Sequence, residues 1–410
     1  MGSAPGRVSF DELDKGGALT IGDGYRTRRD ELGRPGFPIL RVAQIGDGAI
    51  DGEPTDYIRH EYERAIGPKL SKADDVVLTT KGTFGRRTRI RPRQAGYAYS
   101  PQVCWFRVQD PARLDPGYLY YWLGSADFAN QASGLKSQTD MADYLSLRDL
   151  RRVRVPMPAV AEQRRIAGIL GTLDDKIELN SLFVARLVQL SRLVFDVRLN
   201  AMKAQEPVEP LTVGDVVEVL ETGGRPQGGV SAYNDGVPSI GAESITGLGE
   251  FDFSKTKYVP VDYYAAMRRG KLENRDVLLY KDGGRPGLFE PHATMVGDGF
   301  PFETAAINEH VYRLRARPPY TQTLLYLWLS GAEAMNEMRV KGTGVAIPGL
   351  NSTALRSIHV PAFMPDAASE LDRILEPLVA RVLLVARESR VLAQTRDLLL
   401  PRLLGAPEMR

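Results

Sequence analysis

The sequence contains very little cysteine and histidine. Its 410 residues include one cysteine, Cys104, and four histidines, His60, His292, His310 and His359. A single cysteine excludes a disulfide within the chain and favours a reducing compartment. Cys104 lies in the apolar run VCWF, which predicts a buried side chain rather than a nucleophile. The histidines lack the spacing of metal ligands, so we expect no metal site.

Long hydrophobic runs are also lacking. No apolar segment is long enough to span a membrane. The start MGSAPGRVSF has no hydrophobic region of a signal peptide and no Ser or Thr at position six for myristoylation. We therefore expect a cytoplasmic protein without membrane contact. A hydrophobic content of 43%, a charged content of 25% and 410 residues predict a globular protein of two or more domains. The net charge of +2 neither requires nor excludes a polyanionic partner.

Catalytic motifs are absent as well. The sequence has no phosphate-binding loop GxxxxGK[ST], no GxSxG elbow and no complete dinucleotide-binding fingerprint. The tetrapeptide at 317–320, RPPY, resembles the Asn/Asp-Pro-Pro-Tyr/Phe motif of DNA amino-methyltransferases. That chemistry needs an acceptor at the first position to hold the amine of a flipped base, and arginine carries only donors. We therefore interpret this segment as a turn and predict no catalytic residue and no cofactor in the chain.

The sequence does contain an internal repeat with a period of about 200 residues, far longer than the roughly 20 to 50 residues of solenoid units. The recurring pairs are Gly24 and Gly224, Pro38 and Pro238, DVVLTTKG from Asp75 and DVLLYKDG from Asp276, LYYWL with Trp122 and LYLWL with Trp328, and Val155-Pro156 and Val360-Pro361. The repeat predicts two similar domains related by an approximate two-fold axis.

Each copy mixes short β-like runs with one helical segment, which predicts a mixed α/β, or α+β, domain. The β-like runs are 37–42, 75–80 and 102–108 in the first copy, and 237–240, 276–280 and 309–314 in the second. The helical segments are near 117–131 and 321–338. We predict domains at 1–156 and 207–361, each followed by a long helix within 157–206 and 362–410.

These long helices carry the clearest local pattern. Apolar positions alternate four and three apart, which is the period of about 3.5 residues of a coiled-coil seam. The first seam is Ile166, Leu170, Leu173, Ile177, Asn180, Val184, Leu187, Ser191 and Val194, and the second is Leu371, Leu375, Leu378, Val382, Val385, Ser389, Leu392, Arg396 and Leu399. The two seams superpose at a constant offset of 205 residues, which predicts antiparallel packing of two helices about 60 Å long.

Four polar positions interrupt the two seams. Asn180, Ser191, Ser389 and Arg396 are interpreted as positions that set the register or as a frayed end of the contact. Pro377 predicts a kink or a late start of the second helix.

The segments that join domains and helices resemble a known family. VPMPAVAEQRRIAGILGTLDDKIELN, at 155–180, is similar to the central conserved region of specificity subunits of type I restriction–modification systems, and TRDLLLPRLLGA, at 395–406, is similar to their distal conserved region. Together with the repeat, the resemblance covers essentially the whole chain. The second helix departs from it, because Ala367-Ala368 stands where the first helix has Glu162-Gln163.

The resemblance implies a function. Each domain would be a target recognition domain that reads one half of an asymmetric, interrupted sequence in double-stranded DNA, and the helices would set the distance between the halves. The subunit would have no catalytic activity. It would dock two modification subunits that methylate adenine, and restriction subunits would join the complex. S-adenosylmethionine, ATP and magnesium are expected only in those partner subunits.

Basic and polar loop residues are the candidates for DNA contact, because cations neutralise phosphates while donors and acceptors read base edges. The segment 81–93 has six basic residues and no acid. The candidates in the first domain are Lys81, Thr83, Arg86, Arg87, Arg89, Lys136, Ser137 and Gln138. Those in the second are Arg225, Tyr233, Lys281, Arg285, Arg339, Lys341 and Thr343. A solvated loop is the alternative for each of them. Because the loops differ between the copies, we predict two different half-sites about 10 bp apart, centre to centre.

Three other functions are compatible with the residues. They are a self-sufficient DNA adenine methyltransferase or nuclease, a coiled-coil scaffold without nucleic acid, and a specificity subunit of a system that only methylates. Binding of S-adenosylmethionine by the chain alone would favour the first, and salt-dependent DNA binding would exclude the second.

Overall fold

The computed structural model describes residues 5–81, 84–135, 137–139, 142–203, 211–230, 233–250, 253–285, 287–344 and 348–405. The chain forms two compact units. Unit 1 consists of Met1–Asp175 and Ala393–Arg410, and unit 2 of Lys176–Leu392. Each unit holds one globular domain together with segments of two long helices. The domain boundaries at 156, 206 and 361 stay predictions, because the units divide the chain within the long helices.

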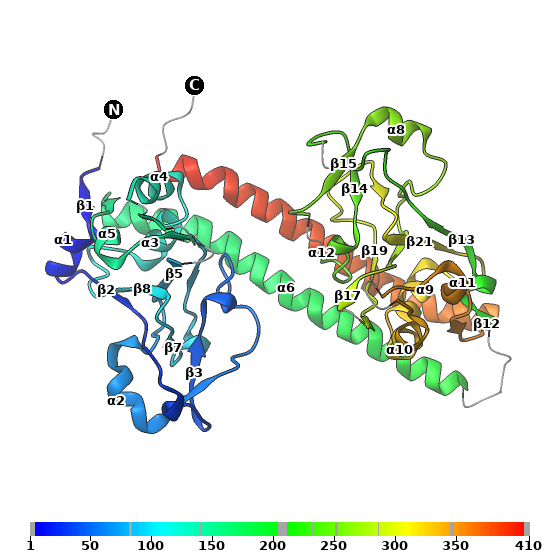
Figure 1. Ribbon diagram of the computed structural model, residues 1–410, viewed down its shortest axis with the longest axis horizontal. Coiled ribbons are helices and arrows are strands. Elements are labelled where there is room, and N and C mark those ends of the chain that lie inside the picture. Colours follow the sequence, from blue (N-terminus) through cyan, green and yellow to red (C-terminus); the bar gives the residue numbers. More distant parts are fainter. Residues whose placement is uncertain are drawn as a thin grey trace. The chain divides into compact units, whose positions relative to one another are not determined.

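The domain of unit 1 contains two sheets (Figure 1). The larger has the strand order β2-β8-β5-β6 and is antiparallel throughout; the smaller has the order β4-β3-β7, with β3 and β7 parallel. The strands are β1 (Arg7–Ser9), β2 (Leu19–Asp23), β3 (Gly36–Leu40), β4 (Tyr57–Arg59), β5 (Val76–Thr79), β6 (Arg87–Arg89), β7 (Ala98–Tyr99), β8 (Val103–Val108), β9 (Ser137–Thr139), β10 (Ala142–Tyr144) and β11 (Arg154–Pro156). The helices are α1 (Phe10–Lys15), α2 (Glu63–Ile66), α3 (Pro116–Trp122), α4 (Ala126–Leu135) and α5 (Leu147–Leu150).

The domain of unit 2 repeats this topology. Its larger sheet has the order β13-β21-β16-β19 and its smaller sheet the order β15-β14-β20. The strands are β12 (Leu211–Thr212), β13 (Val217–Thr222), β14 (Val237–Ile240), β15 (Lys257–Val259), β16 (Val277–Tyr280), β17 (Gly284–Arg285), β18 (Leu288–Phe289), β19 (Ala293–Met295), β20 (Ala306–Ile307), β21 (Val311–Ala316) and β22 (His359–Val360). The helices are α7 (Val213–Val216), α8 (Val261–Ala266), α9 (Gln322–Leu329), α10 (Ala332–Lys341) and α11 (Ser352–Arg356). The predicted mixed α+β fold with two similar domains is therefore confirmed.

The central strands are apolar because both faces of the larger sheet are buried. Alternate residues of a strand point to opposite faces. In unit 1, Val76 and Leu78 contribute to a core beneath the helices, while Val77 contributes to a second core on the other face. In unit 2, Val277 and Leu279 contribute to one core and Leu278 to the other. The runs VVLT and VLLY therefore lack the polar alternation of a half-exposed strand.

A buried ion pair lies at the equivalent position of each domain, directly before the central strand. In unit 1, Asp75 accepts two hydrogen bonds from the Arg107 guanidinium, at 2.7 and 2.6 Å, and one from the Tyr99 hydroxyl at 2.7 Å. In unit 2, Asp276 binds both Arg313 and Arg315. Each aspartate directly precedes a central strand, so the recurring DVVL and DVLL segments have the same structural role in both copies.

Two details of the repeat differ from the sequence prediction. Each predicted single helix is two helices, α3 and α4 or α9 and α10, interrupted at 123–125 and at 330–331. The structural equivalent of Gly24 is Gly223 rather than Gly224. A Cβ at Gly24 would lie 2.0 Å from the Ser100 carbonyl oxygen, and one at Gly223 would lie 1.6 Å from that of Ile307. The first sequence offset is thus wrong by one residue, because GG at 223–224 offers two matches.

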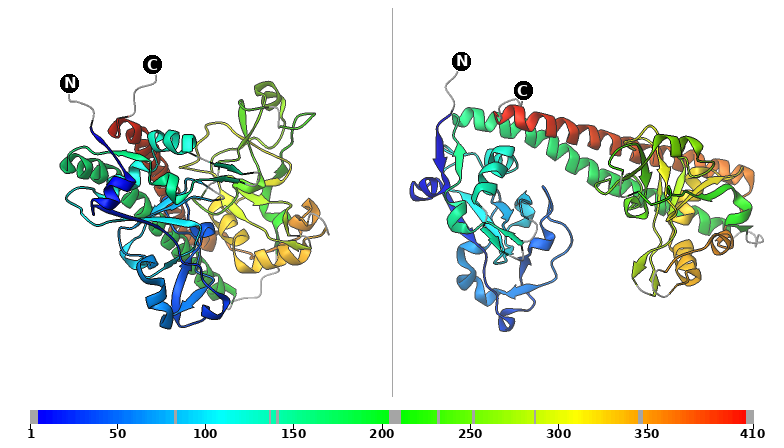
Figure 2. Two further views of the ribbon diagram at one scale, coloured as in Figure 1. Left: turned by 60° about the vertical axis from the view of Figure 1, so that its left-hand side comes forward. Right: turned by 45° about the horizontal axis from the view of Figure 1, so that its top comes forward.

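The two long helices are α6 (Val160–Lys203) and α12 (Pro365–Leu403), and Figure 2 shows their segments side by side. In unit 2, the Asn180 amide donates to Glu388 at 2.9 Å, while the Phe195 ring lies 6.4 Å from the ring of Phe363, just before α12 begins. Later residues of α6 thus meet earlier residues of α12, and the predicted antiparallel packing is confirmed within this unit. The late start suggested by Pro377 is wrong, because α12 begins twelve residues earlier.

The buried stripe of each helix drifts away from the predicted seam. Ile166, Leu170, Val184 and Leu187 are buried in α6, as are Leu371, Leu375, Val382 and Val385 in α12. Leu173, Ile177, Leu378 and Leu392 are half-buried. Phe195 is buried where Val194 was predicted, and Val379 is buried beside Leu378. A straight helix has about 3.6 residues per turn, so its buried face shifts by one position after several turns of a 3.5-residue pattern.

Across the described residues, no helix is both long and apolar enough to cross a membrane.

Candidate nucleic-acid interface

A groove of about 510 Å³ in unit 1 lies where β2 and β5 end and β8 begins. Its charged lining residues are Asp23, Arg26, Lys69 and Lys81, so cations outnumber acids. The Lys69 ammonium donates to Asp23 at 3.0 Å and to the Gly24 carbonyl at 2.6 Å, which fixes one cation at the groove. Cys104 also lines the groove. Burial raises the pKa of the Cys104 thiol, so the thiol stays protonated and is a poor nucleophile.

In the basic segment 81–93, some side chains are exposed to solvent and others bind residues of the same unit. Arg86 is exposed. Arg87, in contrast, is only 15% exposed and donates to the Tyr120 carbonyl and to Asp47, both at 3.1 Å. Arg89 lies 3.5 Å from Asp74 and Arg91 lies 3.0 Å from Asp175 of α6. Most of this run therefore supports the domain internally, which leaves Lys81 and Arg86 as the exposed candidates of the segment.

The other candidates of the first domain lie in or beside the β9–β10 hairpin. Ser137 and Gln138 belong to β9, which pairs antiparallel with β10. Their side chains, and the whole of Thr83 and Lys136, lie outside the described residues. Their role in DNA contact stays a prediction.

A groove of about 610 Å³ occupies the corresponding end of the larger sheet in unit 2. Its lining includes Glu243, Asp282, His292 and His310, so its charge differs from that of the first groove. His310 Nδ1 lies 2.5 Å from an Asp282 oxygen. Lys281 donates to the Glu309 carbonyl at 3.0 Å.

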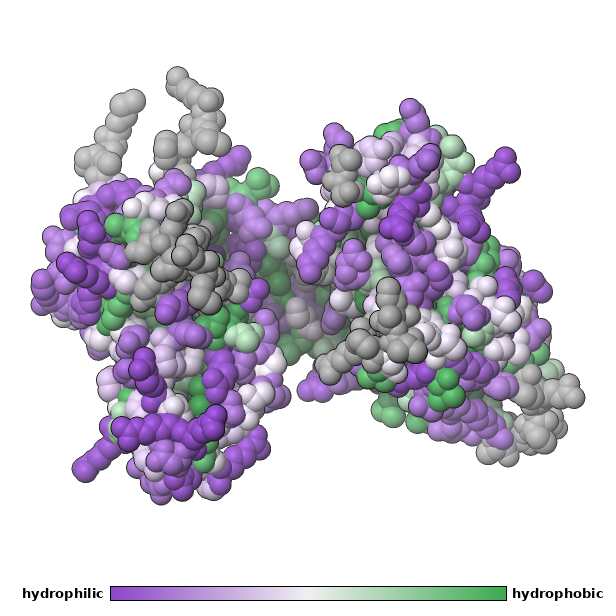
Figure 3. Space-filling view, viewed as in Figure 1, coloured by the Kyte–Doolittle hydropathy of each residue, from purple (hydrophilic) through white to green (hydrophobic). Residues whose placement is uncertain are grey.

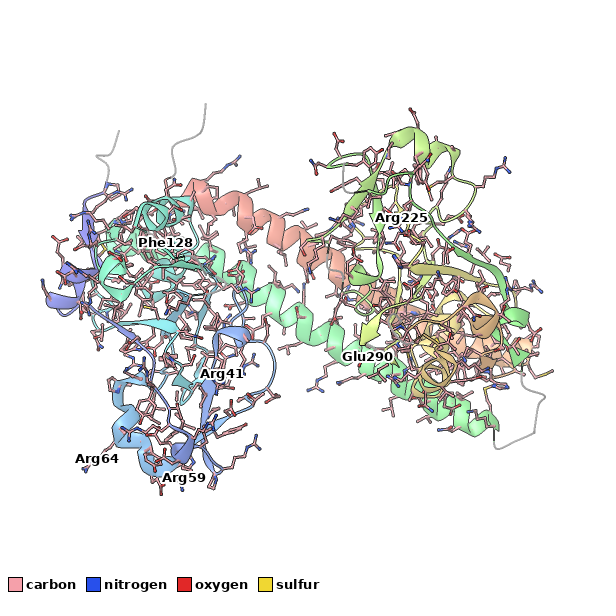
Figure 4. All side chains as sticks on the ribbon, viewed as in Figure 1. Arg41, Arg59, Arg64, Phe128, Arg225 and Glu290 are labelled. Carbon is pink, nitrogen blue, oxygen red and sulfur yellow. The ribbon has the colours of Figure 1, made fainter. Side chains whose placement is uncertain are left out.

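The remaining candidates of the second domain lie in different environments. Arg225, labelled in Figure 4, is 60% exposed and forms an ion pair with Glu309 at 2.8 Å. Arg339 and Thr343 are exposed, and Tyr233 is half-buried. Lys341 donates to Glu337 and to the Ser357 carbonyl, both at 2.7 Å, so it joins α10 to α11. Arg285 belongs to the β17–β18 hairpin, and its side chain lies outside the described part of the chain.

Sequence reasoning missed a group of arginines beside the smaller sheet of unit 1. Arg41, Arg59 and Arg64 lie on β4, on α2 or next to β3 (Figure 4). The Arg34 guanidinium stacks 3.9 Å from the centre of the Tyr57 ring, and Arg59 lies opposite Gly36 in the β3–β4 pairing. These arginines are spread over 31 residues of sequence and form no basic run. Arg41 lies 2.6 Å from Asp56 and Arg59 lies 3.2 Å from Glu61.

The long helices carry exposed apolar side chains in addition to their buried stripe. On α6 these are Leu179, Leu182, Phe183, Leu190, Leu193 and Val197, with exposed fractions between 42% and 60%. On α12 they are Leu384, Val391 and Leu398, between 43% and 65%. Figure 3 shows hydrophobic residues at the surface of the helices. We call these two sets the outer stripes.

The outer stripe of α6 is a separate face of the helix. At about 100° per residue, Leu179, Leu190 and Val197 project within about 20° of one another, whereas Val184 and Ser191 project about 120 to 140° away. Leu384, Val391 and Leu398 are spaced by seven residues, or about two turns. Leu179 and Leu384, like Leu193 and Leu398, are 205 residues apart, which is the offset of the buried seams. Both helices therefore present the same kind of outer face.

Gln163 is a structural residue. It is buried, accepts a hydrogen bond from the Asp115 amide at 2.9 Å and donates to the carbonyls of Pro158 and Arg113. Glu162 pairs with Arg165 on its own helix at 2.7 Å. The second helix has Ala367-Ala368 at these positions, so it lacks the hydrogen bonds that Gln163 makes, while its outer stripe is unaffected.

Among the described residues, no group of three or more His, Cys, Asp and Glu side chains could hold a metal ion.

Comparison with known proteins agrees with this geometry. A family model, the type I restriction modification DNA specificity domain, matches residues 21–182. The specificity subunit of the type I restriction enzyme MjaIX of Methanocaldococcus jannaschii is 22% identical over 89% of this chain and 88% of that protein. The MjaVIII specificity subunit of the same organism is 24% identical over 39% of this chain, and the match spans only 38% of that subunit's length.

A solved structure shows the same fold over the whole chain. The type I restriction–modification S subunit from M. genitalium aligns with 100% of this chain and 98% of its own, with a TM-score of 0.55 and 15% sequence identity. The duplicated sheets followed by long helices thus define a two-domain specificity-subunit fold. Residues 21–182 match the type I restriction modification DNA specificity domain, and the chain as a whole is similar to type I restriction enzyme specificity subunits.

Proposed function

We propose that this chain is the non-catalytic subunit that selects the DNA sequence for a type I restriction–modification complex. Each globular domain reads one half-site in double-stranded DNA. The observation that carries this proposal is one duplicated scaffold with two differently charged grooves. The charged and histidine residues that line the groove of unit 1 are Asp23, Arg26, Lys69 and Lys81, and those of unit 2 are Glu243, Asp282, His292 and His310. The clearest difference at an equivalent position is Lys81 after β5 and Asp282 after β16. Sheets of the same strand order with different groove chemistry suit the recognition of two different half-sites.

Cations at the first domain favour contact with phosphates. Lys81, Arg86 and the arginines beside the smaller sheet are the residues we assign to this contact, and polar residues of the hairpins are assigned to base edges. Phosphate contacts position a protein on DNA, while base contacts supply the sequence information. Because the two domains differ at these places, the target is asymmetric and interrupted.

The outer stripes are the proposed docking sites for two modification subunits. Each stripe is an exposed apolar face on a long helix, and such a face fits an apolar helix of a partner packed alongside it. The occurrence of the stripes at the same offset as the buried seams supports two equivalent sites rather than one. Restriction subunits join the complex, and S-adenosylmethionine, ATP and magnesium belong to the partner subunits. A DNA-reading role places the complex in the cytoplasm.

Sequencing adenine methylation in the host, with and without this gene, tests the proposal. The expected result is an asymmetric target of two half-sites separated by unspecified bases, with its methylation lost in the deletion strain. A continuous palindromic target would contradict the proposal. Clear binding of S-adenosylmethionine by the purified chain alone would instead support a self-sufficient methyltransferase. Adenine methylation in a host without DNA cleavage would identify a system that only methylates.

A further inference from the structure

Two consecutive carboxylates on α6 connect three separate parts of unit 1. Asp174 accepts a hydrogen bond from the Tyr121 hydroxyl of α3 at 2.7 Å and another from the Arg396 guanidinium of α12 at 2.8 Å. Asp175 lies 3.0 Å from the guanidinium of Arg91, in the segment that follows β6. The recognition domain, the helix that follows it and the distal helix therefore meet at one pair of residues.

The surroundings of Asp174 make these contacts specific. The Asp174 side chain is 19% exposed, and a cavity of about 240 Å³ beside it is lined by Asp47, Arg87, Tyr120, Arg396 and Asp397. Apolar packing alone does not fix an orientation, because it has no direction. Charge-assisted hydrogen bonds have a preferred distance and angle, so they restrict how the domain is turned on the helices.

The pair is special to the first domain. At the offset of 205 residues, the positions of Asp174 and Asp175 are occupied by Val379 and Ala380, which carry no charge. Unit 2 uses other carboxylates of α12 for a similar purpose. Asp372 accepts a hydrogen bond from Thr321 at 2.5 Å, and Glu376 contacts both Thr323 and Arg275. Each recognition domain thus makes its own polar contacts with the helix that follows it.

We propose that Asp174 and Asp175 are positioning residues that set the orientation of the first recognition domain, and thereby the spacing between half-sites that the complex accepts. This inference rests on the proposed function. Adding one base pair moves a half-site by about 3.4 Å along the DNA axis and turns it around the helix. A domain held by directional contacts rejects such a change, whereas a domain held only by apolar contacts adapts to it.

The test uses the full chain assembled with its modification subunits. The probes are duplexes that carry both half-sites identified by methylation sequencing, at the native spacing and at one base pair more or less, and a duplex that carries the first half-site alone. Asp174→Ala should reduce the preference for the native spacing by roughly tenfold, as expected for a coupling between contacting charged groups. Affinity for the single half-site should stay within about twofold.

A second variant separates positioning from folding. Arg396→Met keeps an apolar stem but removes the cation, and it should reduce spacing preference in the same way. Asp174→Ala removes the hydrogen bonds from both Tyr121 and Arg396, whereas Arg396→Met removes only the second, so the double variant should be no worse than Asp174→Ala alone. Glu370→Gln, which removes an exposed α12 carboxylate that makes no hydrogen bond or ion pair with the described residues, is the matched control and should leave spacing preference unchanged.

Two outcomes would overturn the inference while leaving the proposed function intact. One is a spacing preference in Asp174→Ala and Arg396→Met equal to that of the unmodified complex. The other is an equal loss of affinity for all duplexes, including the single half-site, which would indicate a purely structural role. If the unmodified complex does not prefer the two-part duplex over random DNA, both the inference and the proposed function fail.

Discussion

Truncation of Leu193 to alanine should weaken binding of one modification subunit. Leu193 lies in the outer stripe of α6 and is 60% exposed. Full burial of a leucine stabilises by roughly 1.5 to 3 kcal/mol relative to exposure, so covering the exposed part of this side chain would contribute about 1 to 2 kcal/mol. At about 1.4 kcal/mol per factor of ten, the Kd for that subunit should rise by roughly 5- to 30-fold.

Calorimetric titration of the chain with purified modification subunit provides the measurement. The unmodified chain should bind two subunits. Leu193→Ala should weaken one of the two sites and leave the other unchanged, and Leu398→Ala on α12 should do the same to the opposite site. The double variant should weaken both. Leu32→Ala, at a leucine 38% exposed in the first recognition domain, is the matched control and should leave both sites unchanged. If Leu32→Ala and Leu193→Ala have equal effects, or if both sites respond to Leu193→Ala, the assignment of one partner to each stripe is wrong.

Three further predictions concern the domains. Asp75→Ala should lower the free energy of unfolding by about 3 to 5 kcal/mol in chemical denaturation, because it leaves the nearly buried Arg107 charge without its partner. The control Lys15→Ala breaks an exposed ion pair with Asp11 and should lower the free energy of unfolding by less than about 1 kcal/mol. The Cys104 thiol should resist alkylation in the native protein even at pH 8.5 and react when the chain is unfolded, because burial raises its pKa; rapid labelling of the native chain would refute its burial. Gly223→Ala should destabilise the second domain strongly in thermal unfolding, since its Cβ would lie 1.6 Å from the Ile307 carbonyl oxygen, whereas Gly168→Ala, in open space on α6, should not.

The repeat and the long helices could be predicted from the sequence because they rest on local patterns. A 3.5-residue apolar period sustained over many turns has few explanations other than a helical contact, and its recurrence at a fixed offset requires two such helices. The β-like runs 75–80 and 276–280 were also located well. Each is apolar on both faces, and each follows an aspartate whose partner, Arg107 or Arg313, lies more than 30 residues away.

The DNA-contact candidates were harder to predict because charge in sequence does not specify direction in space. Arg87 belongs to the most basic run of the chain, yet it is packed against Gly124, where an added Cβ would lie 2.0 Å from its guanidinium carbon. Nothing in the segment RRTRIR distinguishes Arg86, which is exposed, from Arg87, which is not. The decisive partners, Asp47 and the Tyr120 carbonyl, lie 40 and 33 residues away.

The inward arginines and the polar seam positions have a common physical cause. Asn180 binds Glu388 and Arg396 binds Asp174, so two of the four polar positions in the apolar seams make contacts between the long helices. Ser191 and Ser389 instead donate to carbonyls of their own helices. Arg91, in the basic run, binds Asp175 of α6. A uniformly apolar seam would tolerate a shift of one heptad, because each leucine would meet another leucine. A polar contact does not tolerate such a shift, since it would leave a partly buried charge without its partner. The contacts of Asn180 and Arg396 therefore define one register between α6 and α12 within each unit.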